Sequence, residues 1–354
     1  MRPAKAVIDL AALRHNYSLA RRIHGGKALA VVKANAYGHG AVACATALAG
    51  VADGFAVACL EEAEALRAAG IESPILLLEG VFEAAELARV DELGLWMVVH
   101  QSEQLAWLEA FAAARPLTVW LKFNTGMNRA GLPLARLAEL HAKLAAAPAV
   151  GSITVMTHFA RADEPDCEET MAQFARLEAA LAGIRVPLSV CNSAGILGWP
   201  SIRGDWARPG IMLYGADPMP GEGHGLRPVM QLESRVMAVR DLAAGDAVGY
   251  GARFVATAPM RVGLVAMGYA DGYPRVVPDG TPLCVGGRRT RIVGRVSMDM
   301  LTVDLTGCDA GVGAPVELWG ATIPVNEIAA AAGTIAYELL CNVKRVRFEY
   351  IHPA

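Results

Sequence analysis

The chain has 354 residues and a formal net charge of −3; 54% of its residues are hydrophobic and 19% are charged. This length suffices for a large core and two domains, and the composition is typical of a compact enzyme rather than a disordered chain. The small net charge argues against nucleic acid or an acidic membrane as a partner. No apolar run reaches the roughly 18 residues of a membrane helix, and we expect no signal peptide at the N-terminus.

The seven cysteines are scattered, and Cys59, Cys191, Cys284 and Cys341 lie within or beside apolar runs. A reduced thiol in such surroundings behaves as a small hydrophobic group. Neither paired cysteines nor a zinc-ligand spacing is present, and the histidines do not cluster with the cysteines. We therefore expect no metal site and a reducing, cytoplasmic environment.

In chain order, the first two thirds alternate short apolar runs with segments whose apolar residues recur at helical spacing, such as Leu60–Ala69 and Met171–Leu181. The apolar runs are hydrophobic throughout, which indicates strands buried on both faces of a parallel sheet. Eight such units predict a closed (β/α)8 barrel of the TIM type. The alternative is a doubly wound open sheet, but no Gly-x-Gly-x-x-Gly motif opens the first unit. The predicted strands are Ala28–Val32, Phe55–Ala58, Ile75–Leu78, Trp96–His100, Thr118–Phe123, Ile153–His158, Leu188–Cys191 and Ile211–Tyr214.

From about Leu226 the sequence becomes rich in β-type segments and in turns. One helix is expected in this part, Val325–Ala332. We predict a barrel domain over residues 1–225 and a mainly β domain over residues 226–354, with the boundary in the Gly/Pro-rich stretch Asp217–Pro228. The predicted β segments are Val229–Leu242, Asp246–Thr257, Arg261–Met267, Arg291–Leu305, Val316–Trp319 and Val343–Ile351.

Lys33 is the first candidate for chemistry, because it stands at the end of an apolar run and before a glycine-containing turn. An amine reacts with an aldehyde only when it is partly deprotonated, and desolvation favours the neutral amine. Tyr37 lies four residues further on, so a helical turn would place its hydroxyl on the same side. This arrangement is expected of a Schiff-base lysine that holds pyridoxal phosphate. The simpler interpretation is a lysine that extends from a strand end into solvent.

The barrel makes an independent prediction, because active-site groups in this architecture lie at the C-terminal ends of the strands. Unusual polar residues do occur there. They are Lys33 after the first strand, Lys122 in the fifth, His158 at the end of the sixth, Asn192 and Ser193 after the seventh, and Arg208 and Gly210 just before the eighth.

The segment from Ala30 to Gly40 resembles the cofactor-attachment motif of alanine racemases. Seven further segments resemble motifs of the same family, in the family's order and over essentially the whole chain. They are 122–129, 156–159, 192–194, 208–215, 248–251, 268–275 and 294–300.

The resemblance implies a pyridoxal phosphate-dependent alanine racemase that works as a homodimer. Lys33 would bind the cofactor and act as the base on the D-alanine face, and Tyr250 of the partner subunit would be the opposite base. His158 would contact that tyrosine and Arg208. Arg208 would face the ring nitrogen and keep it unprotonated, because a guanidinium cannot accept a proton. From the residues alone, Arg208 could equally be a rim arginine paired with Asp205, and Tyr250 a turn aromatic.

The resemblance also implies the binding residues. The cofactor phosphate would be held by the hydroxyls of Tyr37, Ser193 and Tyr337 and by the backbone N–H groups of Gly210 and Ile211, which suits the phosphate position in TIM barrels. The substrate carboxylate would be bound by Arg129 and by the backbone N–H of Met298 of the partner subunit. The entrance would be lined by Tyr269, Tyr337, Asp163, Arg275 and Arg295.

Lys122 corresponds to a lysine that many family members carry in carbamylated form, where it orients the residue matching Arg129. We expect the same here if the amine is buried enough to be partly neutral. The chain departs from the family at Asn124, where an aspartate is usual. The loss of one negative charge bears on the degree of carbamylation and on substrate strictness.

Three alternatives remain open. A single-barrel pyridoxal phosphate-binding homeostasis protein also begins with a Val-Lys strand end, but leaves the last 130 or so residues unexplained. A two-domain decarboxylase predicts an acidic residue at the ring nitrogen. A racemase of broad specificity stays open because of Asn124. Whether the enzyme would make D-alanine for peptidoglycan or degrade it is not decided by these residues.

Overall fold

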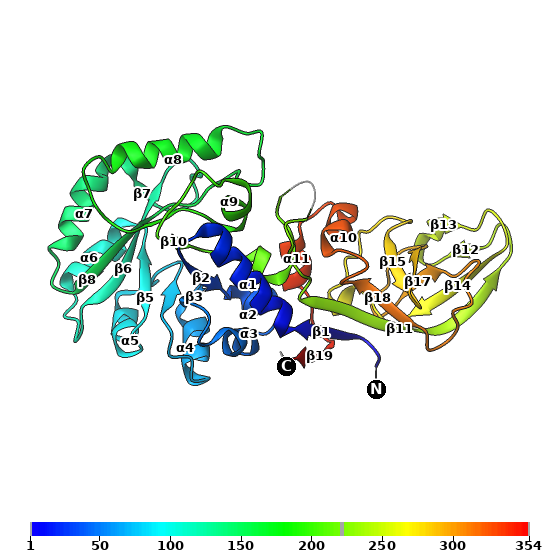
Figure 1. Cartoon of the computed structure of the whole chain (residues 1–354). Helices are drawn as coiled ribbons and strands as arrows, with labels where there is room; N and C mark the ends of the chain where they lie inside the picture. The colour runs from blue at the N-terminus through cyan, green and yellow to red at the C-terminus, as the bar shows by residue number, and fades with distance from the viewer. Residues whose placement is uncertain (1, 220–222, 353–354) are drawn as a thin grey trace.

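A computed structural model describes residues 2–219 and 223–352 of the chain. It consists of a larger lobe with a parallel sheet surrounded by helices and a smaller lobe built mainly of strands (Figure 1). The long strand β11 (Met230–Leu242) runs from the junction of the two lobes into the smaller one. The fold class predicted from the sequence is confirmed.

The larger lobe is a nearly closed barrel of eight parallel strands in the order β10-β2-β3-β4-β5-β6-β8-β9. A short strand, β7 (Leu132–Pro133), adds to β6. The two ends of the sheet meet where the backbone N–H of Arg208 donates to the carbonyl of Cys191 at 3.0 Å. The barrel strands are β2 (Lys27–Val31), β3 (Gly54–Val57), β4 (Ile75–Leu77), β5 (Trp96–Val99), β6 (Leu117–Asn124), β8 (Val150–Met156), β9 (Leu188–Ser189) and β10 (Trp206–Ala207).

One predicted strand is wrong. Ile211–Tyr214 forms a 3-10 helix (η3), and the eighth barrel strand is the preceding pair Trp206–Ala207, which aligns with Lys27 and Ala28 of β2. All four residues of η3 are buried. A short apolar run that is buried on every side has no periodicity to distinguish a strand from a helical turn.

Helices cover the outside of the barrel, and α1 shows how the sequence sets their ends. Asp9 caps its N-terminus by accepting hydrogen bonds from the backbone N–H groups of Ala11 and Ala12, and Gly25 ends it with a φ of 81°. The barrel helices are α1 (Leu10–His24), α2 (Lys33–Tyr37), α3 (Ala41–Leu48), α4 (Leu60–Ala68), α5 (Leu87–Glu92), α6 (Ser102–Ala110), α7 (Leu137–Ala145), α8 (Glu169–Ala180) and α9 (Ser193–Gly198), with 3-10 turns η1 (Ala84–Glu86) and η2 (Leu134–Arg136).

The smaller lobe contains antiparallel pairs around β11, which contacts β1, β14 and β18. Its strands include β1 (Lys5–Asp9), from the start of the chain, which pairs in parallel with β19 and antiparallel with β11. The first strand therefore belongs to the sheet of the smaller lobe, and α1 leads from it to the barrel. The other strands are β12 (Ala247–Val248), β13 (Phe254–Val255), β14 (Met260–Val265), β15 (Pro282–Val285), β16 (Arg288–Arg291), β17 (Leu301–Asp304), β18 (Pro315–Trp319) and β19 (Arg347–Ile351).

The predicted helix Val325–Ala332 is confirmed as α10, but a second helix, α11 (Ala336–Cys341), follows it and was not predicted. The predicted β segment Arg291–Leu305 is wrong over residues 293–300, which form no strand between the isolated bridge at Ile292 and the start of β17. The predicted domain boundary includes residues 220–222, which lie outside the described residues. Among the residues described, no helix is long and apolar enough to cross a membrane.

Candidate active site

The C-terminal ends of the barrel strands bring four cationic side chains around one histidine. Partial burial, followed by the charges of Arg208, Lys122, Arg129 and Lys33, holds the pKa of His158 well below its usual value. This electrostatic influence requires the five side chains to be neighbours, although they come from four different strand ends. The predicted cluster of Lys33, Lys122, His158 and Arg208 is therefore present.

Lys33 begins an unusual turn at the end of β2. Residues Ala34 to Tyr37 have φ values of 52°, 54°, 56° and 50°, so four consecutive non-glycine residues adopt the left-handed conformation. This conformation costs roughly 1–2 kcal/mol per residue. The surrounding structure holds the turn, since Ala34 N–H donates to Glu62 Oε1 at 2.7 Å and Asn35 Oδ1 accepts from Ala41 N–H at 2.8 Å. The helical turn expected after Lys33 is present, but with left-handed twist.

This turn delivers Tyr37 to a group of aromatic rings. Tyr37 stacks on Tyr214 with ring centroids 4.8 Å apart, and Tyr337 of α11 lies 5.8 Å from Tyr37 on another side. Tyr214 in turn donates its hydroxyl to the carbonyl of Val31 at 2.9 Å. Burial raises the pKa of both Tyr37 and Tyr337, the latter to about 12, so both hydroxyls stay protonated and can donate hydrogen bonds.

The predicted phosphate anchors lie beside the Tyr37 hydroxyl. Ser193 Oγ accepts from the backbone N–H of Gly210 at 2.9 Å and of Met212 at 3.3 Å. An ideal β-carbon on Gly210 would lie 2.5 Å from Tyr37 Oη, so only glycine leaves this space open. Ile211 is the first residue of η3, and the first N–H groups of a helix have no acceptor within it. The residues present therefore fit a phosphate group.

Arg208 is buried and reaches into the barrel without a carboxylate partner among the described residues. Its guanidinium donates to the carbonyls of Ser189 (2.8 Å) and Thr157 (2.7 Å) and approaches His158 Nδ1 at 3.5 Å. Burial lowers its pKa to about 10, which still leaves it charged at neutral pH. The alternative pairing with Asp205 is wrong, since the Asp205 carboxylate accepts from the backbone N–H of Leu188.

Lys122 is half-buried beside this group, on β6. Burial, together with the charges of Arg208, Arg129 and Lys33, lowers its pKa to about 8. A fraction of the amine is therefore neutral near physiological pH, which is the condition that carbamylation requires. Arg129 is exposed and has no ion-pair or hydrogen-bond partner among residues 2–219 and 223–352, so its guanidinium is free to bind a carboxylate.

Asn124, the position that departs from the family pattern, organises the turn that leads to Arg129. Its Oδ1 accepts from the backbone N–H groups of Gly126 (3.1 Å) and Asn128 (3.0 Å), and its Nδ2 donates to Asn128 Oδ1 at 2.7 Å. Asn128 has a φ of 57°. The amide thus joins two parts of the turn, and a carboxylate could not make the bond to Asn128 Oδ1.

The remaining predicted residues lie on the smaller lobe and on the junction. Tyr250, in η4 (Tyr250–Ala252), is 68% exposed and Met298 is 52% exposed. Within the described residues, neither makes a hydrogen bond, ion pair or ring contact with the barrel cluster of the same chain. Tyr269, in η5 (Tyr269–Asp271), donates its backbone N–H to Ser297 O at 3.0 Å and so lies beside Met298.

The predicted entrance residues lie in two neighbouring cavities. Asp163, Ile211 and Tyr337 line a cavity of about 280 Å³, and Tyr269 and Arg275 line another of about 440 Å³. Thr334 belongs to both cavities, so they meet at the loop between α10 and α11. Arg295 lies near Gly249, beside Tyr250, rather than in either cavity.

Two residues that contact the candidate site were not assigned a role in the sequence analysis. Tyr214 supports the Tyr37 ring, and its only signal was its place in the segment 208–215. Ser189, whose hydroxyl and carbonyl both accept from Arg208, lies inside a two-residue strand and gives no signal in sequence.

Comparison with known proteins decides the family. Residues 8–218 match the alanine racemase N-terminal domain and residues 229–350 match the alanine racemase C-terminal domain. The chain belongs to the alanine racemase family. Members of this family are isomerases that depend on pyridoxal phosphate, so the enzyme class predicted from the sequence is confirmed.

Individual relatives cover the whole chain. An alanine racemase of Azoarcus sp. is 65% identical over 99% of both chains. The solved biosynthetic alanine racemase of Pseudomonas aeruginosa is 48% identical, with a TM-score of 0.96 over 99% of this chain and 100% of that one. The alanine racemase of Bartonella henselae, solved with covalently bound pyridoxal phosphate, is 29% identical, with a TM-score of 0.90 over 99% and 100%.

Proposed function

We propose that this racemase interconverts L- and D-alanine with pyridoxal phosphate bound at Lys33, using Lys33 and Tyr250 of the partner subunit as its two bases. The convergence of Lys33, Arg208 and the close contact between Tyr37 and Gly210 at one end of the barrel carries this proposal. It joins an amine, a fixed cation and a place for a phosphate within one site. The covalent cofactor of the Bartonella henselae relative supports the same assignment.

The cofactor, when bound, withdraws electrons from the substrate and makes the Cα proton acidic enough to remove. Its phosphate would be held by the hydroxyls of Tyr37, Ser193 and Tyr337 and by the N–H groups of Gly210 and Ile211. These donors carry no charge of their own, and oriented backbone N–H groups suit an anion. Arg208 would face the ring nitrogen, and since it stays charged it would donate there and not accept a proton.

Proton transfer would be divided between the two bases. Lys33 Nζ would remove or return the proton on the D-alanine face. Tyr250 of the partner subunit would do the same on the opposite face through its phenolic oxygen. His158 is poised to act through Arg208 and this tyrosine, because a strongly lowered pKa keeps its imidazole neutral and able both to donate and to accept.

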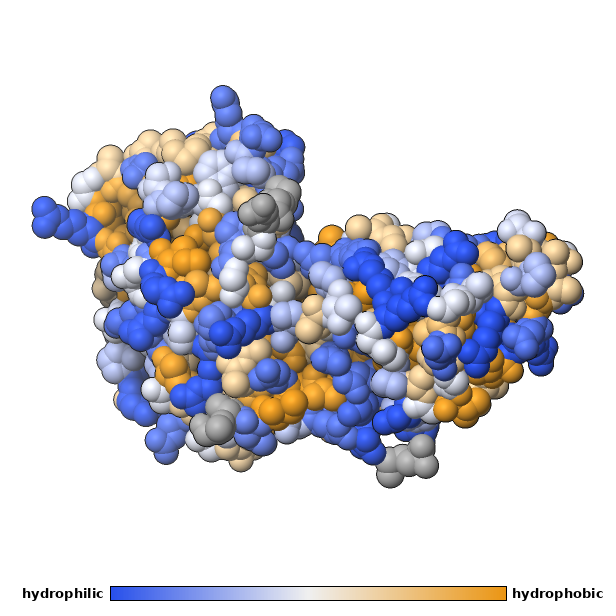
Figure 2. Space-filling view, turned by 45° about the vertical axis from the view of Figure 1, so that its right-hand side comes forward, coloured by the Kyte–Doolittle hydropathy of each residue, from blue (hydrophilic) through white to orange (hydrophobic). Residues whose placement is uncertain are grey.

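The exposure of hydrophobic side chains on the smaller lobe supports a homodimer with shared sites. Large hydrophobic side chains gather among its exposed residues, and Figure 2 shows apolar patches on the surface of this lobe. Exposed apolar residues of this kind mark interfaces. Besides Tyr250 and Met298, they include Met237, Val255, Val276, Met300 and Val312.

Substrate binding would use Arg129 and the backbone N–H of Met298 of the partner subunit for the carboxylate. Tyr269, Tyr337, Asp163, Arg275 and Arg295 would line the entrance. A narrow entrance is needed for selectivity, because an added methylene in an apolar pocket discriminates by only about 1–3 kcal/mol without a clash. We place the enzyme in the cytoplasm, where D-alanine would serve peptidoglycan synthesis or be degraded.

The first test is the formation of D-alanine from L-alanine by the protein supplied with pyridoxal phosphate, beside a Lys33→Ala variant. The parent should form D-alanine and show a bound cofactor absorbance, and the variant should show neither. A yellow parent that forms no D-alanine would keep the cofactor site and refute alanine as substrate.

Turnover of lysine, arginine and serine in the same assay tests a broad specificity. The parent and an Asn124→Asp variant should be compared, because this substitution removes the bond from Asn124 to Asn128. Release of carbon dioxide would favour the decarboxylase alternative. Cofactor binding without turnover of any amino acid would favour the homeostasis alternative.

A further inference from the structure

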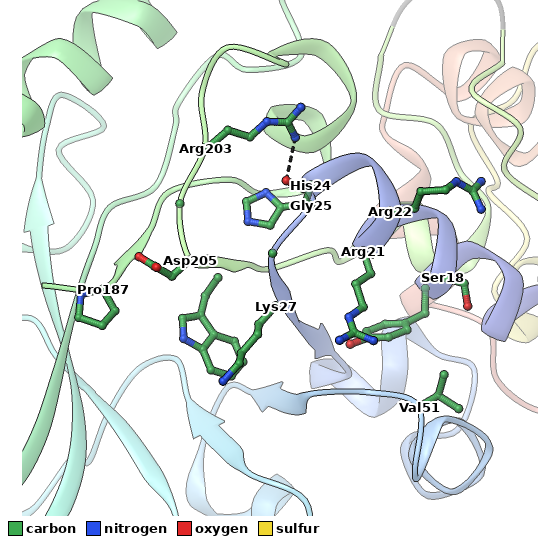
Figure 3. A pocket seen from close by; sticks show the side chains of 14 residues that line it. Ser18, Arg21, Arg22, His24, Gly25, Lys27, Val51, Pro187, Arg203 and Asp205 are labelled. Atoms are coloured by element: carbon green, nitrogen blue, oxygen red, sulfur yellow. Dashed lines mark hydrogen bonds between the residues drawn. The ribbon is translucent and has the colours of Figure 1, made fainter.

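A second cavity lies at the other end of the barrel from Lys33, where strands β2 and β10 begin and helix α1 ends. Its volume is about 940 Å³, which is at the upper end of the range for small-molecule sites. Figure 3 shows it between the last turn of α1, the start of β2 and the loop that leads into β10. None of the residues assigned to the racemase site belongs to it.

The lining of this cavity is cationic. Arg21, Lys27 and Arg203 surround it, and Asp205 is the carboxylate among the residues that line it. The Asp205 carboxylate accepts from the backbone N–H of Leu188 at 2.8 Å, and its single negative charge faces four lining cations, since Arg22 also belongs to the lining. The cavity therefore carries an excess of positive charge.

Arg22 also lines the cavity, and each of the other three cations has a structural contact that leaves donors free. Arg21 Nε pairs with Asp53 at 3.1 Å, and Arg203 Nη1 donates to the last carbonyls of α1. Lys27 Nζ lies 5.1 Å above the Trp206 ring. These contacts orient the groups, yet the terminal Nη atoms of Arg21, Nη2 of Arg203 and Nζ of Lys27 have no hydrogen-bond acceptor within the described residues.

The burial of the His24 ring is not explained by a purely structural role. The residue is 3% exposed, and neither ring nitrogen makes a hydrogen bond of good geometry among the residues the structure describes, the backbone of Gly204 being a neighbouring polar group. Buried polar groups are paired in most proteins, because an unpaired one costs about 1–3 kcal/mol. In Figure 3 the imidazole projects from the end of α1 into the space bounded by Arg203, Asp205 and Lys27.

We propose that this cavity binds a small organic phosphate. The phosphate oxygens would accept from the free donors of Arg21, Lys27 and Arg203, and a turn of the His24 ring, whose two nitrogens are enclosed in this structure, would add a further donor. A tetrahedral dianion can accept from several directions at once, whereas a carboxylate is matched by a single guanidinium fork. Pro187, Val51 and the Trp206 ring form apolar walls that leave room for an organic group beside the phosphate.

Trp206 supplies a signal for binding. It belongs to a cluster with Trp96 and Trp120, whose rings lie 5.5 and 5.8 Å from it. A ligand that draws Lys27 away from the Trp206 ring would change its fluorescence. The change should saturate with ligand concentration.

The test uses the full-length protein at constant ionic strength, titrated with inorganic phosphate and with phenyl phosphate by calorimetry and by tryptophan fluorescence. Phenyl phosphate should bind saturably and more tightly than inorganic phosphate. Lys27→Gln and Arg21→Gln should each weaken it about tenfold, the loss of one charge-assisted contact. Because Arg21 also holds Asp53, the Lys27→Gln variant is the decisive one should Arg21→Gln fail to fold.

Arg14→Gln is the matched control. It removes one positive charge from an exposed position of the same helix, outside the cavity, and should leave the affinity unchanged. His24→Leu should also weaken binding, since it removes both ring nitrogens. Two results would overturn the proposal: the absence of saturable binding by either probe, or binding that Lys27→Gln and Arg14→Gln affect equally.

Discussion

The hydroxyl of Tyr37 packs so closely on Gly210 that an ideal β-carbon built on residue 210 would lie 2.5 Å from Tyr37 Oη. The two residues are far apart in sequence and meet because a left-handed turn after β2 carries Tyr37 across to the start of η3. Ser193 Oγ also contacts Gly210, because it accepts a hydrogen bond from the backbone N–H of that residue. The predicted phosphate donors are thus arranged around a position that only glycine permits.

Gly210→Ala should weaken the binding of pyridoxal phosphate. The added methyl group must displace the Tyr37 hydroxyl, and we expect a loss of roughly tenfold or more in cofactor affinity, which corresponds to one lost hydrogen bond to a charged group. The measurement is a titration of the apoprotein followed by cofactor absorbance. Gly311→Ala is the control, because nothing lies within 4 Å of its β-carbon. Equal affinities for the two variants would show that Tyr37 and Gly210 do not hold the phosphate.

Carbamylation of Lys122 should increase with pH in bicarbonate-containing buffer. The reactive form is the neutral amine, and since the pKa of Lys122 is lowered to about 8, the neutral fraction rises steeply between pH 7 and pH 9. Intact-mass spectrometry would detect the mass of one added carbon dioxide. Lys122→Arg should show no such addition. An unmodified mass for the parent throughout this range would contradict the expectation.

Lys122 should also affect stability in a pH-dependent way in buffer free of carbon dioxide. Its pKa is about 8 in the folded protein against 10.5 as the ordinary value, so the unfolded state binds more protons between these values. The free energy of unfolding therefore rises with pH between the two pKa values. The cost of burying the charged amine is fully present below pH 8. Urea titrations should show Lys122→Met about 2 kcal/mol more stable than the parent at pH 7, after allowance for partial exposure, and less so at pH 10. A constant difference would contradict this.

Two inactive variants, Lys33→Ala and Tyr250→Phe, should recover activity when mixed. Random exchange makes half of the dimers hybrid, and each hybrid has one site with an intact Lys33 and an intact Tyr250 of the partner subunit. We expect about a quarter of the parent activity. The assay needs a measurement of subunit exchange beside it, for example with differently labelled subunits. No recovery under complete exchange would exclude shared sites.

Asp271→Asn should destabilise the protein by about 3 kcal/mol, measured by urea unfolding. The Asp271 carboxylate is fully buried, pairs with Arg2 and accepts from the backbone N–H of Gly268 at 2.9 Å. Asp299→Asn is the control, because Asp299 pairs with Arg345 near the surface and such pairs contribute less than about 1 kcal/mol. The loss of unfolding free energy should be clearly larger for Asp271→Asn than for Asp299→Asn.

Asp271 also bears on the entrance, since it ends the 3-10 turn that carries Tyr269. An ideal β-carbon on Gly268 would lie 2.3 Å from Met298 O, so this turn packs directly on the segment that contains Met298. Asp271→Asn should therefore raise KM for alanine more than it lowers kcat. An unchanged KM would show that this turn does not contribute to substrate binding.

The sequence by itself determined the elements whose local pattern was unambiguous. Seven of the eight predicted barrel strands and helix α10 follow from continuous or periodic hydrophobicity, which depends only on neighbouring residues. The polar residues at the strand ends follow from the same argument, because parallel strands of a barrel end on one face. The motifs pointed to the family without any tertiary information.

Only the tertiary structure decided the rest. Long-range pairing places the first strand, β1, against β11 and β19, and Ile211–Tyr214, buried on all sides, forms a 3-10 helix rather than a strand. The left-handed turn at Ala34–Tyr37 contains no glycine, so its sequence does not predict this conformation. Contacts with Glu62 and neighbouring segments maintain it. The physical reason is the same in each case: the energy that selects these conformations comes from residues distant in the chain, and local sequence does not contain it.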